Sequence, residues 1–210
     1  VQRFHLPEIC PVCGTKTVRE KDTADIKCPS PNCPSQVERR IINFVSRDAM
    51  DIKGFGSVYI EDLVRRGFIR DIADIFVLKE HRTQMIEEGL IGKEKNTDKL
   101  LDAIEGAKQR DAYQLLTGFG IPNVGKAAAK AVMKQFGTIE NLAAASVEQL
   151  VEVPDIGEVS AGCIQRFFQD ASNQEMIRRL KEEGVNMAYI RQEGESERFA
   201  GMTFVITGTL

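Results

Sequence analysis

The sequence lacks any run of about 18 apolar residues, so we expect no membrane-spanning helix. Its first residues also lack the charged and then apolar pattern of a signal peptide, and we therefore expect a cytoplasmic protein. An excess of positive charge is missing too, because 28 Lys and Arg against 31 Asp and Glu leave a net charge of -3. This balance argues against a generally basic nucleic-acid binder. It allows one that binds phosphates through backbone amides and a few local cations.

Four of the five cysteines lie near the start of the chain, in a C-x2-C pair and a C-x4-C pair. Two turns that each present two sulfurs predict a tetrahedral zinc site, whose ligands would be Cys10, Cys13, Cys28 and Cys33. The segment 16–27 between the pairs is mostly polar and predicts a short hairpin. With four thiolates, no open coordination position and no neighbouring His, we expect this zinc to be structural rather than catalytic. Disulfides are the alternative.

The fifth cysteine, Cys163, lies near Ile164 and Phe167 in a predicted helix, where we expect a buried apolar role. An unpaired fifth cysteine and the absence of a signal peptide both disfavour the disulfide alternative for the other four.

One turn pattern recurs along the rest of the chain: an apolar residue, Pro or Lys, a residue that tolerates positive φ, an apolar residue and Gly. An amphipathic helix follows each copy, so the pattern predicts helix-hairpin-helix units. The copies are Ile52-Lys53-Gly54-Phe55-Gly56, Ile121-Pro122-Asn123-Val124-Gly125 and Val153-Pro154-Asp155-Ile156-Gly157.

A Gly-rich turn at a helix start leaves several N–H groups unpaired, adds the positive end of the helix dipole, and removes the Cβ that would block close approach. Together these features predict a phosphate site that needs no basic side chain. Lys126 would add charge to the third hairpin, and Asp155 is expected to cap its own turn. The candidate DNA-binding residues are Gly54, Phe55, Gly56, Asn123, Val124, Gly125, Lys126, Asp155, Ile156 and Gly157. The alternative is a corner used only for packing.

A degenerate second unit is expected between the first and third. Counting back seven places from the apolar Leu100 puts Lys93 in the Gly position and Ile91 in the position that requires positive φ. We therefore predict that this hairpin differs in shape, and that it either binds a phosphate through Lys93 or Lys95 or does not bind one.

The expected fold is mainly α: a small four-Cys zinc finger, a helical domain of four helix-hairpin-helix units, and a terminal β-strand. Helices are predicted at 57–66, 71–78, 97–108, 112–117, 124–136 and 158–168. Capping-box patterns at Ser146–Gln149 and Ser172–Glu175 predict two further helix starts. The polar segment 191–198 is typical of a linker. The strand at 202–207 either begins another domain or caps the helical body.

This order of motifs resembles the C-terminal part of the bacterial NAD-dependent DNA ligases over almost the whole chain. The resemblance implies that residues 1–9 are the end of an OB-fold domain or a linker, 10–36 the zinc finger, and 37–190 the helix-hairpin-helix DNA-binding domain. It also implies a linker at 191–198 and the first strand of a truncated BRCT domain at 199–210. The zinc ligands and the hairpin glycines Gly56, Gly125 and Gly157 match positions that bind zinc and DNA in that family.

By the same resemblance, the whole enzyme seals nicks in double-stranded DNA during replication and repair, using NAD and Mg²⁺ bound in its other parts. Its adenylation domain carries a Lys-x-Asp-Gly nucleophile, which has no match here. We therefore expect this segment to be inactive alone and to hold duplex DNA, without sequence specificity, for the adenylation and OB-fold domains. Two alternatives stay open: a DNA-repair glycosylase or lyase of the helix-hairpin-helix type, and a zinc-stabilised protein-interaction module.

Overall fold

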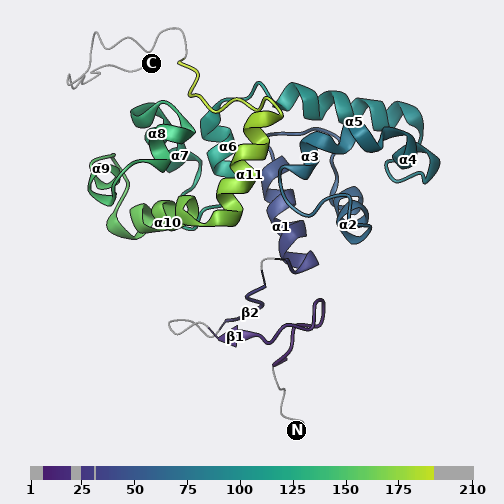
Figure 1. Cartoon of the computed structure of the whole chain (residues 1–210), viewed down its shortest axis with the longest axis horizontal. Helices are drawn as coiled ribbons and strands as arrows, with labels where there is room; N and C mark the ends of the chain where they lie inside the picture. The colour runs from purple at the N-terminus through teal and green to yellow at the C-terminus, as the bar shows by residue number, and fades with distance from the viewer. Residues whose placement is uncertain (1–6, 20–24, 31, 192–210) are drawn as a thin grey trace, which may run out of the picture.

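The computed structural model describes residues 7–19, 25–30 and 32–191. A small module at the N-terminus leads into a helical body, as Figure 1 shows. The body consists of α1 (Pro34–Val45), α2 (Ser57–Arg65), α3 (Asp74–Val77), η1 (Leu78–His81), α4 (Arg82–Glu87), α5 (Glu94–Ala107), α6 (Ala112–Gly118), α7 (Lys126–Phe136), α8 (Ile139–Ala143), α9 (Val147–Val151), α10 (Glu158–Gln169) and α11 (Ala171–Glu182). The mainly α fold with a four-cysteine cluster is confirmed. Within the described ranges, no helix has the length and apolar character needed to cross a bilayer.

The N-terminal module is held by two short hairpin contacts. Strands β1 (Val18–Arg19) and β2 (Ile26–Lys27) pair antiparallel, which confirms the hairpin predicted in this segment. An isolated bridge joins Ile9 to Lys16, and the Thr17 amide donates to the Glu8 carbonyl at 2.9 Å. The module ends at Cys33, whose carbonyl accepts from the amides of Gln36 and Val37 in the first turn of α1. The turn that carries the second cysteine pair therefore also starts the first helix of the body.

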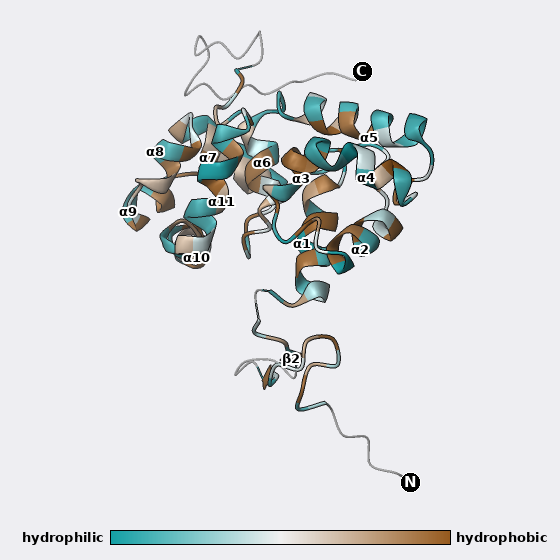
Figure 2. Ribbon diagram, turned by 45° about the vertical axis from the view of Figure 1, so that its right-hand side comes forward, coloured by the Kyte–Doolittle hydropathy of each residue, from teal (hydrophilic) through white to brown (hydrophobic). Residues whose placement is uncertain are grey.

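The centre of the body is the contact between α1 and α6, where the backbones approach closely. A Cβ added at Gly118 would lie 2.7 Å from Phe44, a side chain that is fully buried. The Asn43 side-chain amide donates to the carbonyls of Thr117 and Gly118 at 3.3 and 3.1 Å. Glycine is needed here because any side chain would push the two helices apart. Figure 2 shows the apolar residues of α1 gathered toward the interior of the body.

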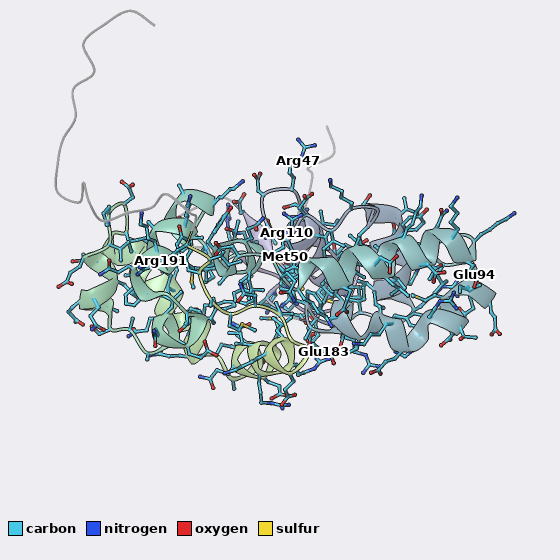
Figure 3. The ribbon with its side chains drawn as sticks, turned by 90° about the horizontal axis from the view of Figure 1, so that it is seen from above. Arg47, Met50, Glu94, Arg110, Glu183 and Arg191 are labelled. Atoms are coloured by element: carbon cyan, nitrogen blue, oxygen red, sulfur yellow. The ribbon has the colours of Figure 1, made fainter. Side chains whose placement is uncertain are left out.

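Ion pairs tie the first two hairpin units to the last two. Arg179 of α11 contacts the carboxylates of Asp71 and Asp74 at 2.7 and 2.5 Å. Arg110 contacts Asp51 at 3.0 Å near the middle of the body, where Figure 3 labels Arg110. These contacts join segments that lie far apart in the sequence, so the two halves of the helical body form one unit.

Several helix boundaries differ from the sequence prediction. The second capping box is wrong: α11 begins at Ala171, and the Asp170 carboxylate accepts from the amides of Ser172 and Asn173. The capping box at Ser146 and Gln149 is confirmed. Helix α5 begins three residues before the predicted start. Helix α8, capped by Thr138, was not predicted, because it has five residues and its third residue is Asn141 rather than the Glu or Gln that completes a capping box. The predicted strand at 202–207 lies outside the described residues.

The one buried side-chain oxygen or nitrogen without a hydrogen-bond partner, within the described part of the chain, is the Thr97 hydroxyl of α5. Thr97 is fully buried at the position where α7 and α10 carry Ala129 and Ala161. A buried hydroxyl without a partner costs free energy, so we expect Thr97→Val, which has the same shape, to raise the free energy of unfolding by about 1 kcal/mol.

Denaturant unfolding at equilibrium checks this expectation. Thr117→Val is the matched control, because the Thr117 hydroxyl donates to the Tyr113 carbonyl at 2.7 Å and its loss should destabilise the protein. Equal changes in the free energy of unfolding of the two variants would contradict the interpretation that the Thr97 hydroxyl is buried without a partner.

Candidate nucleic-acid interface and metal centre

The four N-terminal cysteines converge on one point. Their sulfur atoms all lie within 4.8 Å of one another. Two of the separations are 3.9 Å, between Cys10 and Cys33, and 3.4 Å, between Cys13 and Cys28. A tetrahedral zinc ion with Zn–S bonds of about 2.3 Å requires sulfur atoms about 3.8 Å apart. Disulfide bonding would require about 2 Å, and all five cysteines are unpaired. The sulfur geometry fits a zinc ion and excludes the disulfide alternative.

The pKa values of these thiols shift in opposite directions, because the sulfurs lie close together in different local surroundings. Hydrogen bonds from Thr15 lower the pKa of Cys13 to about 6. The backbone amide of Ser30 by itself lowers the pKa of Cys28, yet burial and the neighbouring Cys13 sulfur raise it to about 12. Burial is the main cause of the raised pKa of Cys33. Like charges disfavour one another at this distance, so four thiolates need a divalent cation between them.

The three predicted hairpins adopt the turn that their sequences indicate. The residues expected to have positive φ are Gly54, Asn123 and Asp155, with φ of 83°, 62° and 65°. In the third and fourth hairpins, the amides of Val124 and Ile156 close the turn onto the carbonyls three residues earlier, both at 3.1 Å. Pro before a residue of positive φ is typical of a type II turn. No side-chain hydrogen bond from Asp155 is found within the described residues, so the cap expected from it is wrong.

Helices that follow these turns begin without a side-chain cap. Gly56, Gly125 and Gly157 are the N-cap residues of α2, α7 and α10, and none supplies a capping oxygen. Elsewhere in the body, Asp111, Thr138, Ser146 and Asp170 cap their helices with side-chain oxygens. Within the described part of the chain, the amides of 56–59, 125–128 and 157–160 donate to no carbonyl or side chain. Each hairpin therefore presents a row of unpaired N–H groups.

The three N-cap glycines are not required by the fold. Their φ values of -70°, -82° and -88° suit any residue. A Cβ built on any of them would meet nothing within 4 Å. All three glycines are exposed: Gly56, Gly125 and Gly157. Ser or Asp would cap these helices better than Gly. Glycine at this position leaves the backbone open to close approach by another molecule.

The second hairpin differs from the others, as predicted. Lys93 is the N-cap residue of α5, with the extended backbone of the glycines in the other units. Ile91 is buried without positive φ, because a β-branched side chain disfavours that conformation, and Gly92 has a φ of 88° instead. The turn still closes by a bond from the Gly92 amide to the Gly89 carbonyl at 3.1 Å. Lys93 and Lys95 are both exposed.

Contacts between units arrange the hairpins relative to one another. The Ser160 hydroxyl of α10 donates to the Asn123 carbonyl at 3.2 Å, which joins the fourth hairpin to the third. The Lys126 ammonium lies 3.3 Å from the Asp48 carboxylate in the first unit. No sequence signal indicated Asp48, because 78 residues separate the pair. The second hairpin lies at the opposite end of the body from α9 and α10, as Figure 1 shows, and Figure 3 labels Glu94 at that end.

Cys163 is half-buried rather than buried, which corrects the sequence expectation. Its sulfur lies 3.2 Å from the Arg166 guanidinium and 3.9 Å from the Asn123 side-chain amide. This sulfur packs beside the third hairpin, far from the metal centre in sequence.

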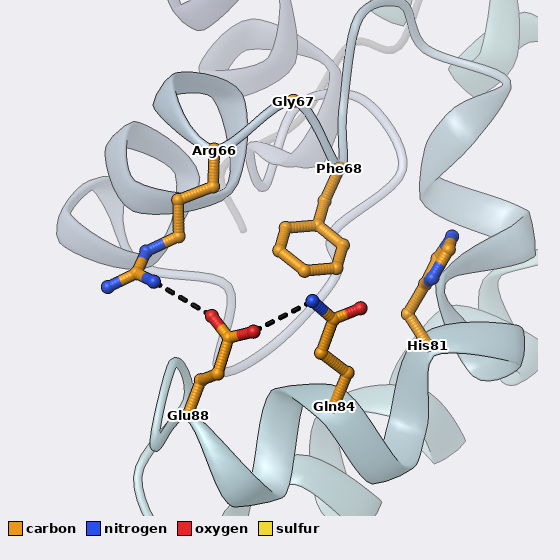
Figure 4. Close-up of a pocket in the computed structure, with 6 residues that line it drawn as sticks. All are labelled: Arg66, Gly67, Phe68, His81, Gln84 and Glu88. Carbon is orange, nitrogen blue, oxygen red and sulfur yellow. Dashed lines mark hydrogen bonds and ion pairs between the residues drawn. The ribbon is translucent and has the colours of Figure 1, made fainter.

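A polar pocket between the end of α2 and α4 is internally satisfied, as Figure 4 shows. Arg66 pairs with Glu88 at 2.8 Å, and the Gln84 amide donates to the same carboxylate at 2.7 Å. The rings of Phe68 and His81 meet edge to face at 5.3 Å. Because each charged group faces an intramolecular partner, we interpret this pocket as a packing corner between the first two units.

Two family descriptions match the chain at these sites. Residues 10–34 match the NAD-dependent DNA ligase C4 zinc finger domain. Residues 114–177, which contain the third and fourth hairpins, match the helix-hairpin-helix motif. The two matches fall on the metal centre and on the two hairpins that the Ser160 hydrogen bond joins.

Curated relatives match along the whole sequence. A DNA ligase of Clostridium kluyveri is 45% identical over 210 residues, which are 100% of this chain and 32% of that protein. DNA ligases of Thermoanaerobacter pseudethanolicus and Acetivibrio thermocellus are 41% and 38% identical, over 100% and 99% of this chain and 31% of each relative. The chain thus spans about a third of the length of these DNA ligases and is similar to them along nearly all of its own sequence, with a match to the zinc finger of NAD-dependent DNA ligases near its start and a match to a helix-hairpin-helix motif in its helical body.

Proposed function

We propose that this chain is the part of a DNA ligase that holds the duplex around a nick. The observation that carries the proposal is the row of unpaired amides at each of three helix starts, combined with N-cap glycines that the fold does not need. Amides at a helix N-terminus, with the positive end of the helix dipole behind them, bind phosphate oxygens. Since such contacts read no base, the binding is without sequence specificity.

Side chains around the hairpins fit the surface of a duplex. Val58 and Val159 are the second residues of α2 and α10, and they are 69% and 70% exposed. Apolar side chains beside the amides suit the deoxyribose that separates two phosphates, whereas Lys93, Lys95 and Lys126 supply cations at the other two hairpins. Of the residues in the sequence analysis, those proposed to contact DNA are Gly54, Gly56, Lys93, Lys95, Asn123, Gly125, Lys126, Asp155 and Gly157. Phe55, Val124 and Ile156 are buried, and the amides of Val124 and Ile156 are already paired within their turns, so these three residues would support the hairpins rather than contact DNA.

The zinc ion, held by the four cysteines, has a structural role in this proposal. It fixes the N-terminal module and the start of α1, and it takes no part in chemistry, because all four of its positions are filled by sulfur. Nick sealing with NAD and Mg²⁺ would be performed by the adenylation and OB-fold domains of a whole ligase, in the bacterial cytoplasm and on nucleoid DNA.

A base-excision activity is not favoured by the geometry. Such an enzyme extrudes its target base into a snug pocket beside the catalytic group. Lys126 does face a carboxylate, Asp48, yet the two side chains are 50% and 78% exposed. An exposed pair of this kind is a surface ion pair rather than an activated amine.

Binding of the whole chain to duplexes at several salt concentrations tests the proposal. We expect similar affinity for duplexes of unrelated sequence. The logarithm of the binding constant should fall only gently with the logarithm of the salt concentration, with a slope of about 0.9 for each phosphate that a cation neutralises. Absence of duplex binding at low salt, or a strong preference for one sequence, would contradict the proposal. In that case the hairpins serve for packing or for protein contacts.

A further inference from the structure

A groove of about 740 Å³ lies between α6 and α7, next to the third hairpin. Its three lysines lie at intervals of four residues on one face of α7, and their backbone positions span about 12 Å along the helix. The alanines between them are small, so the floor of the groove is open to a bulky anion. The lining residues are Tyr113, Lys126, Ala127, Lys130, Ala131 and Lys134.

This charge distribution is peculiar to α7. The corresponding positions carry Ser57, Glu61 and Arg65 in α2, Glu94, Asp98 and Asp102 in α5, and Glu158, Gly162 and Arg166 in α10. Each of those helices has at least one carboxylate there, whereas α7 has three ammonium groups. Like charges four residues apart destabilise a helix by a few tenths of a kcal/mol. This arrangement costs the helix a little stability and concentrates positive charge along one face of α7, next to the third hairpin.

The aromatic side of the groove positions one of these cations. The Lys130 ammonium lies 5.9 Å from the centre of the Tyr113 ring, within the range of a cation–π contact. This contact holds Lys130 over the groove rather than in the solvent beside it.

We propose that this groove binds the phosphodiester backbone of the same DNA that the third hairpin holds, and that Asp48 competes with a phosphate for Lys126. The inference rests on the proposed function, because it extends that interface. Its support is continuity: Lys126 is both the first residue of α7, beside the unpaired hairpin amides, and one end of the lysine row. A DNA strand that reaches the hairpin amides lies at the mouth of the groove.

Asp48 is expected to weaken DNA binding, in contrast to the lysines of the groove. Its carboxylate is 78% exposed and lies 3.3 Å from the Lys126 ammonium, where it neutralises the cation nearest the hairpin. A phosphate bound at the hairpin would have to displace this carboxylate to pair with the ammonium. Removing the negative charge should therefore strengthen DNA binding, an effect that misfolding cannot produce.

Salt titration of binding to a nicked duplex, with the whole chain, tests the groove. We expect Lys130→Gln with Lys134→Gln to lower the logarithmic salt slope by about 1 to 2. The control Lys99→Gln with Lys181→Gln makes the same change in net charge at exposed positions outside the groove, and should keep the parental slope. A parental slope in the first variant would overturn the inference and leave the hairpins as the interface. Absence of duplex binding by the parent would instead overturn the proposed function, and this inference with it.

The competition by Asp48 is tested with the same duplex. Asp48→Asn should raise affinity by about two- to fivefold, as expected for loss of a surface ion pair. The gain should vanish when Lys126→Gln is combined with it, since the effect acts through that ammonium. An equal gain in both backgrounds, or none in either, contradicts the competition. Binding of inorganic phosphate to the lysines without any effect of Lys130→Gln and Lys134→Gln on DNA would show a small-anion site instead.

Discussion

Replacing Cys28 with serine is expected to abolish stoichiometric zinc binding and to unfold the N-terminal module, while the helical body stays folded. The four sulfurs lie within 4.8 Å of one another, and in the described residues of the module the backbone is otherwise held by two strands of two residues each, an isolated bridge and a few turn hydrogen bonds. Structural zinc sites contribute on the order of 10 kcal/mol or more to the folding of such modules. The body keeps its own core, in which Phe44, Leu63 and Leu115 are fully buried.

Zinc content and amide hydrogen exchange measure this result. We expect loss of protection in residues 7–19 and 25–30, fraying of the first turn of α1 next to Cys33, and parental protection in α5 to α11. Cys163→Ser is the matched control, because Cys163 lies outside the cluster and its loss should leave one zinc ion per chain. Retention of zinc and of protection by Cys28→Ser would show that the module folds without a four-sulfur site.

Replacing Gly125 and Gly157 together with threonine is expected to reduce duplex affinity at least about a hundredfold while preserving the fold. Threonine caps a helix about as well as glycine, and Thr138 already caps α8 in this way. Its Cβ meets nothing within 4 Å in the protein, but it fills the space that a phosphate would need. Each hydrogen bond to a charged group contributes about 1.5–3 kcal/mol, which corresponds to tenfold or more for each hairpin.

The control for this experiment is Gly106→Thr, another glycine with open space around its Cβ position, located in α5 away from the hairpins. Melting temperatures of the three proteins should agree within a few degrees, and only the double hairpin variant should lose binding. If that variant binds the duplex as tightly as the parent, the unpaired amides do not hold DNA. A large drop in its melting temperature would show instead that the glycines serve the fold.

Local chemistry explains why the metal centre and three of the hairpins are predictable from the amino-acid sequence. Two closely spaced cysteine pairs determine a tetrahedral ligand set with little help from the rest of the chain. Pro122 followed by Asn123, and Pro154 followed by Asp155, restrict φ so strongly that the turn follows from a few residues. The same reasoning locates the irregular second hairpin, because Ile91 disfavours the positive φ that the other units use.

Helix boundaries are less predictable, since more than one polar residue can cap each start. At α11, Ser172 and Glu175 fit a capping box. Asp170 lies two residues before Ser172, however, and its carboxylate accepts hydrogen bonds from the backbone amides of Ser172 and Asn173. The choice is a competition between hydrogen bonds of similar strength. Burial of the apolar face against the body, through Met176 and Leu180, is compatible with either start.

Two kinds of site follow from residues that are close together in the chain: a four-thiolate metal centre, and Gly-rich turns that leave helix amides unpaired. Both depend on contacts within a few residues, so their chemistry is encoded locally. The contacts between distant groups could not be predicted in this way: Asp48 lies beside Lys126, Ser160 contacts Asn123, and Tyr113 faces Lys130. These contacts depend on how helices pack across repeats, and packing is set by the whole apolar core rather than by any local pattern.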